Sequence, residues 1–376
     1  MSDTRPGVII AGAGLSGLAL ALALQRAGLS DWALYDAGDP TPAPSELMPV
    51  TPNGARVLHA LGLRDWLAAN AEQPATMEER VGGNGFALRE LPLGTFGADR
   101  FGAPFYLVDY KALLGALRDA LGRDVPMRAV RWPTSTDASG TGPTALIVLA
   151  TGLAPASTPV GESAKLNAWR GDVPLAAVPE SLRSNSESLW VGGDRALWLR
   201  RSAVAGRAQF TAIAAPRRTG AAPLEGLFSG WHPVIGTLLQ HATCCAPLPW
   251  PAAGGEPMLE PQAATVAMGD AAHPLPGALL QGPAAALEDA WVLSRFLEQH
   301  EHAAAEAAAQ YVRYRSKRAA LLLARDQAAT ARLLFATPLA RARDRLTSTL
   351  TGRFLPELAM ARLDWIYRYD CVRGFE

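Results

Sequence analysis

The sequence predicts an α/β fold in which both ends of the chain build one parallel sheet, and a largely antiparallel sheet is inserted between them. Three observations predict it. The chain opens with an apolar run, a glycine-rich turn and a helical run, Val8–Ala27. A second strand-like run with its own glycine turn and long helix lies far downstream, Ala264–His300. Between them, short alternating runs with aromatics, bounded by Pro and Gly, are typical of antiparallel strands.

The first segment reads as strand, turn, helix and strand. The apolar run Val8–Ala11 leads directly into Gly12-Ala13-Gly14-Leu15-Ser16-Gly17. A Leu- and Ala-rich helical run follows and reaches Gly28, a residue type that commonly ends helices. The next strand-like run, Trp32–Tyr35, ends in Asp36. An acid about 20 residues beyond a G-x-G-x-x-G turn, between a strand and a helix, indicates a dinucleotide site.

Each glycine of this turn has a physical role in such a site. Gly12 permits the tight turn, Gly14 lets the backbone approach a pyrophosphate, and Gly17 lets helix and strand pack closely. The helix N-terminus supplies free N–H groups for phosphate, and the acid accepts from a ribose hydroxyl. The alternative is an ordinary βαβ unit whose glycines serve packing alone. The predicted cofactor contacts are Gly12, Gly14, Leu15, Ser16, Gly17 and Asp36.

The downstream segment repeats the order of strand, glycine-containing turn and helix. A strand-like run, Ala264–Met268, ends in Gly269-Asp270-Ala271-Ala272-His273-Pro274. Gln281-Gly282-Pro283 then opens a long helical run, and Pro suits a first helical turn because its missing N–H would be unpaired there. Asp270 follows the carboxyl end of a strand, where α/β sheets bind ligands. A helix N-cap or a surface carboxylate is the alternative for Asp270.

These motifs resemble the single-component FAD-dependent aromatic hydroxylases, the group A flavoprotein monooxygenases, in the branch of salicylate hydroxylase and 3-hydroxybenzoate 6-hydroxylase. The resemblance spans nearly the whole chain in the expected order. It rests on Gly12–Gly17, Ala168–Gly171, Gly230–Pro233, Gly269–Pro274 with Gln281-Gly282, Leu287–Ala290 and Leu363–Asp370.

The resemblance implies a Rossmann-like FAD-binding domain of the glutathione-reductase-like and p-hydroxybenzoate hydroxylase-like type, an inserted antiparallel-sheet substrate domain, and C-terminal helices. We expect the FAD-binding domain at residues 1–75, 103–160 and 264–330. The substrate domain would comprise 76–102 and 161–263, with a C-terminal helical segment at 331–376.

The resemblance also implies a reaction. An FAD-dependent monooxygenase of this family hydroxylates a small phenol or hydroxybenzoate-like aromatic through a flavin C4a-hydroperoxide, with NAD(P)H as reductant and oxygen as co-substrate. The carboxylate matching Asp270 contacts the ribityl hydroxyls, and the loop Pro274–Gly282 lines the isoalloxazine. The family pattern therefore adds Gly269, Asp270, Pro274, Gln281 and Gly282 to the cofactor contacts.

The flavin drives the chemistry in this family, so no catalytic side chain is assigned, and His273 beside Pro274 is expected to be structural. An arginine fork suits a benzoate carboxylate. For each candidate substrate contact, ordinary surface or interdomain pairing is the alternative. The candidates are Arg170, Arg200, Arg201, His232 and Tyr106.

The chain departs from the family in its middle Asp-Gly motif, which is degenerate. Thr151 stands at the Asp position, and Pro155 and Thr158 replace the usual Ser and Arg. Tyr110, beside Lys111, replaces an arginine that contacts the cofactor. Leu280 replaces the first glycine of Gly-Gln-Gly, and Gly277 with Pro276 replaces a proline facing the flavin. Two alternatives therefore stay open: a flavoprotein homologue that serves as a binding or accessory protein, and an FAD oxidase or dehydrogenase without a nicotinamide step.

Composition narrows the functional classes and compartments that the sequence allows. The 376 residues contain 35 Lys+Arg and 35 Asp+Glu, and this neutral balance argues against a nucleic-acid binder. Three cysteines, two of them adjacent, make a poor disulfide framework and favour the cytoplasm, and no Cys/His spacing indicates a metal. No signal peptide or stable membrane insertion is expected. The basic row along the helical run 303–346 predicts a solvated face, with a membrane-surface helix as the alternative. Monomer and homodimer both stay open.

Overall fold

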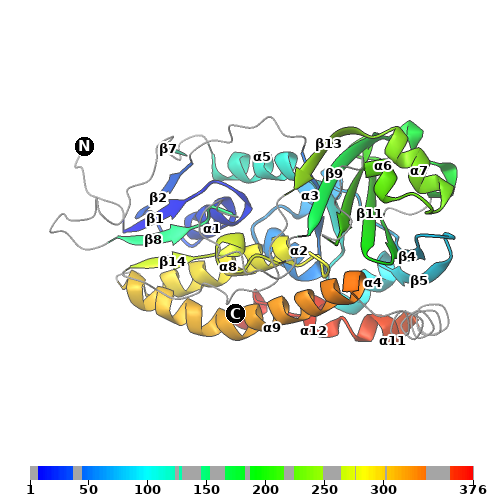
Figure 1. Cartoon of the computed structure of the whole chain (residues 1–376). Helices are drawn as coiled ribbons and strands as arrows, with labels where there is room; N and C mark the ends of the chain where they lie inside the picture. The colour runs from blue at the N-terminus through cyan, green and yellow to red at the C-terminus, as the bar shows by residue number, and fades with distance from the viewer. Residues whose placement is uncertain are drawn as a thin grey trace.

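The fold is described by a computed structural model of the chain. It describes residues 7–36, 45–122, 127–128, 145–152, 166–182, 187–215, 224–248, 264–275, 277–300, 303–335 and 356–375. Pro155, Thr158 and Pro276, three of the positions singled out in the sequence, lie outside the described residues. The described elements form two large sheets lying beside one another, with helices on their outer sides (Figure 1).

The first sheet is parallel and has the strand order β14-β8-β1-β2-β7. These strands are β1 (Val8–Ala11), β2 (Trp32–Tyr35), β7 (Met127–Arg128), β8 (Leu146–Leu149) and β14 (Thr265–Ala267). Val8 of β1 pairs with Trp32 on one side and with Leu146 on the other. Strands from both ends of the chain therefore share one sheet, which confirms the predicted α/β fold.

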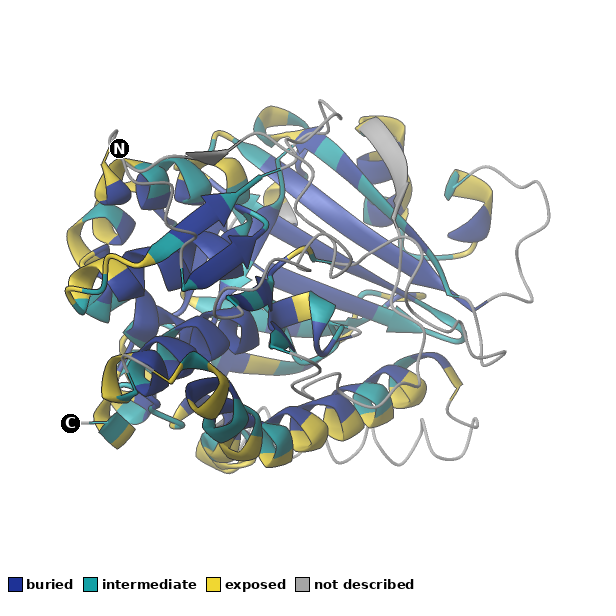
Figure 2. Cartoon of the chain, turned by 90° about the vertical axis from the view of Figure 1, so that its left-hand side faces the viewer, coloured by how far each residue is buried: buried dark blue, intermediate teal, exposed yellow. Residues whose placement is uncertain are grey.

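Helices pack beside this sheet and on one another. They are α1 (Leu15–Arg26), α5 (Tyr110–Leu121), α8 (Gly282–Gln299) and the long α9 (Ala304–Phe335). Every residue of α1 from Leu15 to Leu24 is buried, because the helix lies between the sheet, α5 and α8. Figure 2 shows buried residues gathered in the strands and on the inward sides of the helices. This all-round burial explains why α1 is almost purely Leu and Ala.

The second sheet has seven strands in the order β13-β9-β12-β11-β10-β4-β5. Five of its six pairings are antiparallel, as predicted, but β10 and β4 pair in parallel. No hairpin joins those two strands, because they come from separate insertions, and so nothing forces them to run antiparallel. The strands are β4 (Thr76–Val81), β5 (Ala87–Pro92), β9 (Asn167–Pro174), β10 (Glu187–Gly192), β11 (Arg195–Ser202), β12 (Arg207–Ala214) and β13 (Thr243–Leu248).

The two faces of the second sheet differ in chemistry. Its outer face is apolar and packs Trp190, Leu197 and Phe210 against α6 (Leu224–Leu227) and α7 (Pro233–Gln240). Because side chains alternate along a strand, Arg200 of β11 and Gln209 of β12 point to the opposite, inward face. The inward face therefore carries polar side chains beside an apolar cluster of Ala196, Trp198 and Ile213, which packs against Leu334 of α9.

A short ribbon and several small helices join the two sheets. The ribbon pairs β3 (Leu47–Val50) with β6 (Tyr106–Asp109). Buried Gln209 accepts the Leu47 N–H at 3.0 Å, and Arg207 bonds both Asp109 and Asp172, so the ribbon is tied to β9 and β12. The helices are α2 (Pro52–Ala60), α3 (Arg64–Asn70), α4 (Thr95–Phe101), α11 (Pro356–Ala361) and α12 (Asp364–Tyr367), with 3₁₀ turns at Leu175–Ala177, Glu180–Leu182, Gly269–Ala271 and Arg373–Phe375.

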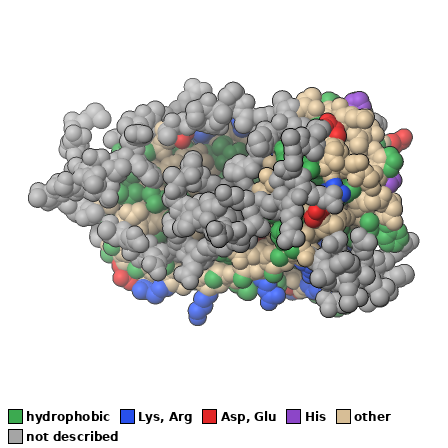
Figure 3. Space-filling view, viewed as in Figure 1, with side chains coloured by type: hydrophobic (Ala, Val, Ile, Leu, Met, Phe, Trp, Pro, Cys, Tyr) green, Lys and Arg blue, Asp and Glu red, His purple; other side chains and the backbone are tan. Residues whose placement is uncertain are grey.

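The basic residues that the sequence places along α9 differ in their exposure to solvent. Arg315 is fully buried, which corrects the expectation of a single solvated face. The exposed members are Arg313, Lys317, Arg325 and Arg332. Lys and Arg side chains lie along the lower edge of the molecule, where α9 runs (Figure 3). Within the described residues, no helix combines the length and apolar content that crossing a bilayer requires.

The first turn makes a specific demand on Gly17. A Cβ there would lie 1.8 Å from the Gly12 carbonyl oxygen, so the backbone would have to move. We predict that G17A lowers the free energy of unfolding by about 1–3 kcal/mol or more, as overpacking does. Gly115 of α5 is the matched control, since an added Cβ meets nothing within 4 Å. G115A should be neutral or stabilising by up to about 1 kcal/mol. Urea unfolding of both variants measures this, and equal stabilities would contradict the assignment.

Candidate active site

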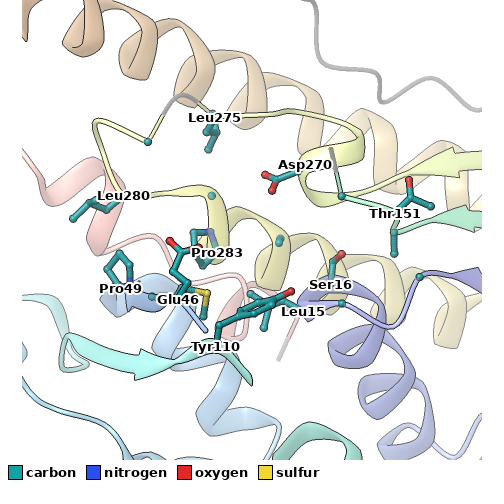
Figure 4. A pocket seen from close by; sticks show the side chains of 18 of the residues that line it. Leu15, Ser16, Glu46, Pro49, Tyr110, Thr151, Asp270, Leu275, Leu280 and Pro283 are labelled. Carbon is teal, nitrogen blue, oxygen red and sulfur yellow. The ribbon is translucent and has the colours of Figure 1, made fainter. Parts of the chain in front are cut away.

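A large cavity opens between the carboxyl ends of β1 and β8 and the inward face of the second sheet. Its volume is about 620 Å³, well within the range of small-molecule and cofactor sites. The N-termini of α1 and α8 both open into it, as Figure 4 shows through Ser16 and Pro283. Residues from both ends of the chain and from the inserted sheet thus meet around one space.

The N-terminus of α1 forms one wall. Gly12 has a φ of +111°, and a Cβ there would lie 2.3 Å from the Ala150 carbonyl oxygen. Gly14 is the N-cap residue and offers no side-chain cap, so the first-turn N–H groups have no partner within the helix. Gly14, Leu15 and Ser16 line the cavity. This is the arrangement that a phosphate group requires.

Tyr110 and Arg118, both from α5, lie beside this turn. The Tyr110 ring lies under Leu15 in the cavity (Figure 4). Burial raises the pKa of the Tyr110 hydroxyl, while a hydrogen bond from the Leu15 backbone N–H opposes the shift. Arg118 approaches the Ala13 carbonyl oxygen at 3.4 Å and the Asp36 carboxylate at 3.8 Å. The cation beside the glycine turn is therefore Arg118, and Lys111 is exposed on α5.

Three strand ends contribute polar groups. Asp36 follows β2, Thr151 follows β8 and Asp270 follows β14, and all three line the cavity. The Asp270 side chain is open to the cavity. Desolvation by the nearby protein raises the pKa of the Asp270 carboxyl, against the opposing effect of His273. A carboxylate here accepts hydrogen bonds from hydroxyl groups of a ligand.

The second sheet supplies the opposite wall through two arginines. Arg200 is 7% exposed, and its Nε lies 3.3 Å from Glu187, also 7% exposed. The two terminal nitrogens of Arg200 have no hydrogen-bond partner among the described residues, and the side chain lines the cavity. Arg170 lines it too but bonds Glu46 at 2.6 Å. Arg200 is thus the cation that this wall offers to a ligand.

These walls fit an FAD molecule. A Cβ on Gly14 would find its nearest atom, the Tyr110 hydroxyl, at 3.5 Å, and one on Gly282 would find Asp270 at 3.9 Å, so both glycines leave bare backbone toward the cavity. The positive ends of two long helices face the same space, which favours the pyrophosphate at one end and an anionic ring edge at the other. Asp36 and Asp270 bring two carboxylates to the cavity, and carboxylates accept hydrogen bonds from sugar hydroxyls.

Comparison with known proteins also supports an FAD site. No protein-family model matches the chain. The chain is 29% identical over 342 residues to 3-amino-4-hydroxybenzoate 2-monooxygenase of Streptomyces cremeus, covering 85% of this chain and 86% of that protein. It is 28% identical to 6-hydroxynicotinate 3-monooxygenase of Bordetella bronchiseptica, over 80% of this chain and 86% of that protein. Over most of its length, the chain is therefore similar to monooxygenases that act on small aromatic acids.

The fold agrees with this similarity. The crystal structure of a variant of Klebsiella pneumoniae HpxO complexed with FAD superposes with a TM-score of 0.79 at 21% identity, covering 96% of this chain and 98% of that one. This chain therefore shares the two-sheet architecture of a protein that was solved with FAD.

A buried ion cluster holds the wall formed by α8. Asp289 accepts the Gly269 N–H at 2.9 Å and the Arg315 Nε at 2.7 Å, and its carboxylate meets the His273 ring at 2.5 Å. Burial alone would raise the pKa of Asp289, but His273 and Arg315 hold it well below its usual range. His273 is fully enclosed and does not line the cavity, so its part is structural, as the sequence suggested.

The loop between Leu275 and α8 is held from the opposite side by Asp326 of α9. Its carboxylate accepts the Gly277 N–H at 2.8 Å and the Leu279 N–H at 2.6 Å. Asp326 is fully buried. Burial raises the pKa of this carboxyl to about 6, although the backbone hydrogen bonds oppose the shift.

The structure brings together some of the sequence-derived candidates and separates others. Gly12, Gly14, Leu15, Ser16, Asp36, Asp270, Gly282, Arg170 and Arg200 line the cavity. Gly17, Gly269, Pro274 and Gln281 do not line it; Gly17 and Gly269 serve packing around it, and Gln281 bonds Asn53 at 2.9 Å.

Three substrate candidates lie elsewhere. His232 caps α7 beside Trp190 on the outer face of the second sheet, so we withdraw it as a substrate contact. Arg201 also points away from the cavity, because it alternates with Arg200 along β11. Tyr106 lines a separate, smaller pocket and its hydroxyl lies 3.1 Å from His59.

Sequence inspection missed Glu46, Glu187 and Asp326. The first two lie in segments without a recognisable motif. Asp326 had a signal: it shares helical spacing with Ala319, Leu322 and Thr330, all buried on the same side of α9. A lone acid within a buried helical stripe predicts a carboxylate with a structural partner.

Asp326 provides a pH-dependent prediction. Its folded pKa lies above the ordinary value of about 3.9, so the stability that its protonated form contributes is present below about pH 4 and lost as the pH rises through about 6. We predict that the stability of wild type relative to D326N falls by about 2–3 kcal/mol across this window. Urea unfolding at several pH values measures it, with exposed D119N as control. A difference between wild type and D326N that does not change with pH would contradict the assignment.

Proposed function

We propose that this protein is an NAD(P)H-dependent FAD monooxygenase that adds one hydroxyl group to a small aromatic acid. The observation that carries the substrate class is Arg200, a buried guanidinium whose terminal nitrogens are free among the described residues, on the cavity wall. Arginine binds planar carboxylates through a two-pronged fork. The two named relatives act on an aminohydroxybenzoate and a hydroxynicotinate, which supports an aromatic acid here.

The cofactor contacts divide between the two helix N-termini. We assign the pyrophosphate to the N–H groups of Gly14–Ser16, with Arg118 as the nearby cation in place of the expected family arginine. Asp36 would accept from the adenosine ribose and Asp270 from the ribityl chain. The N-terminus of α8 would face the flavin edge that becomes anionic on reduction, which its dipole stabilises.

When bound, FAD supplies the redox chemistry, taking a hydride from NAD(P)H and activating oxygen for transfer to an electron-rich ring. The chain's own residues bind and orient. Arg200 would hold the substrate carboxylate while Glu187 fixes the guanidinium from behind at 3.3 Å. Burial raises the pKa of Glu187, and Arg200 opposes this shift. The enclosed wall also keeps water from the reacting ring.

The domain division that we propose follows the two sheets, with the FAD-binding domain at 1–75, 103–160 and 264–330 and the substrate domain at 76–102 and 161–263. We propose the cytoplasm as its compartment, where NAD(P)H is supplied. The free buried thiol of Cys371 is consistent with a reducing compartment.

The function is tested on the purified, FAD-loaded protein. Under anaerobic conditions, NADH or NADPH is added with a panel of hydroxylated aromatic acids while the flavin absorbance is followed. We expect one acid to speed flavin reduction and, in air with labelled oxygen, to gain one labelled atom. Flavin bleaching by substrate without NAD(P)H would instead identify an oxidase or dehydrogenase, and failure to take up FAD would identify a binding or accessory protein.

Arg200 gives a kinetic prediction. R200K keeps a cation opposite Glu187 but loses the planar fork, so we predict a rise in KM for the aromatic acid of about tenfold or more, the equivalent of roughly 1.4 kcal/mol. R201K is the matched control on the outward face of the same strand. Steady-state kinetics measure both variants. An unchanged KM in R200K, with normal melting, would remove Arg200 from the substrate site.

A further inference from the structure

A second, smaller pocket lies behind the main cavity. Its volume is about 80 Å³. Apart from a few polar groups, its lining is apolar, chiefly Met77, Leu91, Leu93, Phe105, Leu279 and Leu363. Only Leu280 and Pro49 line both spaces among the described residues. These two side chains therefore form the partition between the two spaces, and both are labelled at one end of the main cavity in Figure 4.

Leu280 has an unusual backbone conformation. Its φ is +57°, in the left-handed region, and among the described residues only Ala264 is another non-glycine there. A side chain with a Cβ disfavours this region, which glycine adopts freely. The conformation therefore persists only because the surrounding structure imposes it.

The neighbouring contacts show what imposes it. On one side, Asp326 holds the N–H groups of Gly277 and Leu279, and the Leu280 N–H closes a turn onto the Gly277 carbonyl at 3.2 Å. On the other side, buried Gln281 donates to Thr51 at 3.1 Å and bonds Asn53. Leu280 is thus fixed between two anchored neighbours.

The ion pair of Arg200 and Glu187 crosses the same partition. Arg200 lines the main cavity and Glu187 lines the small pocket. A ring whose carboxylate is held by Arg200 would therefore lie close to the partition. The small pocket begins behind it, so the Leu280 side chain limits how far a substrate can extend beyond one ring.

We propose that Leu280 sets the size of the aromatic acid that this enzyme accepts, and that Asp326 positions it by holding the loop in a conformation that leucine disfavours. The proposal rests on the proposed function for the identity of the ligand. With Leu280 in place the site takes single-ring acids. Without its side chain, the small pocket joins the cavity and admits a second fused ring.

Ligand binding to the FAD-loaded protein tests the size limit. The probes are 4-hydroxybenzoate for one ring and 6-hydroxy-2-naphthoate for two, with binding followed by perturbation of the flavin spectrum. In wild type we expect the hydroxybenzoate to bind more tightly. In L280A and L280G we expect the naphthoate-to-benzoate affinity ratio to rise about tenfold or more. An unchanged ratio, with the hydroxybenzoate still binding, overturns the proposal.

Melting temperatures of the cofactor-free proteins test the positioning role of Asp326 without any ligand. L280G and L280A both lack the side chain, but only glycine relieves the left-handed strain. We expect L280G to melt above L280A, and this gap to shrink in a D326A background, because loss of both carboxylate oxygens releases the loop. L280A melting at or above L280G, or a gap unaffected by D326A, overturns the positioning role.

The two tests separate the proposal from the function on which it rests. If neither acid binds any variant, the aromatic-acid function fails and the size limit fails with it, while the melting comparison still decides the role of Asp326. If the hydroxybenzoate binds and the affinity ratio does not move, the function stands and the role of Leu280 is wrong.

Discussion

The buried carboxylate of Asp289 is the interaction on which the rest of this structure depends. It binds the Gly269 backbone, His273 and Arg315 at once, and its neighbour Glu288 binds Arg315, Arg318 and Asn53. Charges with no exposure are tolerable only when every partner is present. One pair of acids on α8 therefore fixes the ligand loop, α9 and α2 together.

This constraint explains the geometry of the site. The cluster locks α8 against the strand end that carries Asp270, so its N-terminus faces the same cavity as the N-terminus of α1. Two positive helix ends converge on one space although their sequences are far apart. The inward face of the second sheet forms the opposite wall of that space and brings to it Arg200, which is paired with buried Glu187.

Sequence analysis predicted the glycine turn and the parallel sheet because each strand–turn–helix unit is a local pattern, as Gly12 and Gly17 show for the first turn. Residue type placed Arg200 among the substrate candidates, and in the structure Arg200 lines the cavity. Sequence analysis misplaced His232, because nothing in a Gly-Trp-His-Pro stretch says which face of a sheet it will cover. The parallel pairing of β4 with β10 and the carboxylate of Asp326 depend on contacts between distant segments, and the left-handed conformation of Leu280 follows from those contacts.

The central claim is that the cavity holds FAD by its dinucleotide half as well as by its ring. The most direct test is to titrate the cofactor-free protein with FAD and, separately, with riboflavin, following flavin fluorescence. The account predicts one FAD per chain and an affinity at least about a hundredfold above that for riboflavin, equivalent to roughly 2.8 kcal/mol from the contacts at Gly14–Ser16 and Asp36. Equal affinities, or no uptake of FAD, would contradict it.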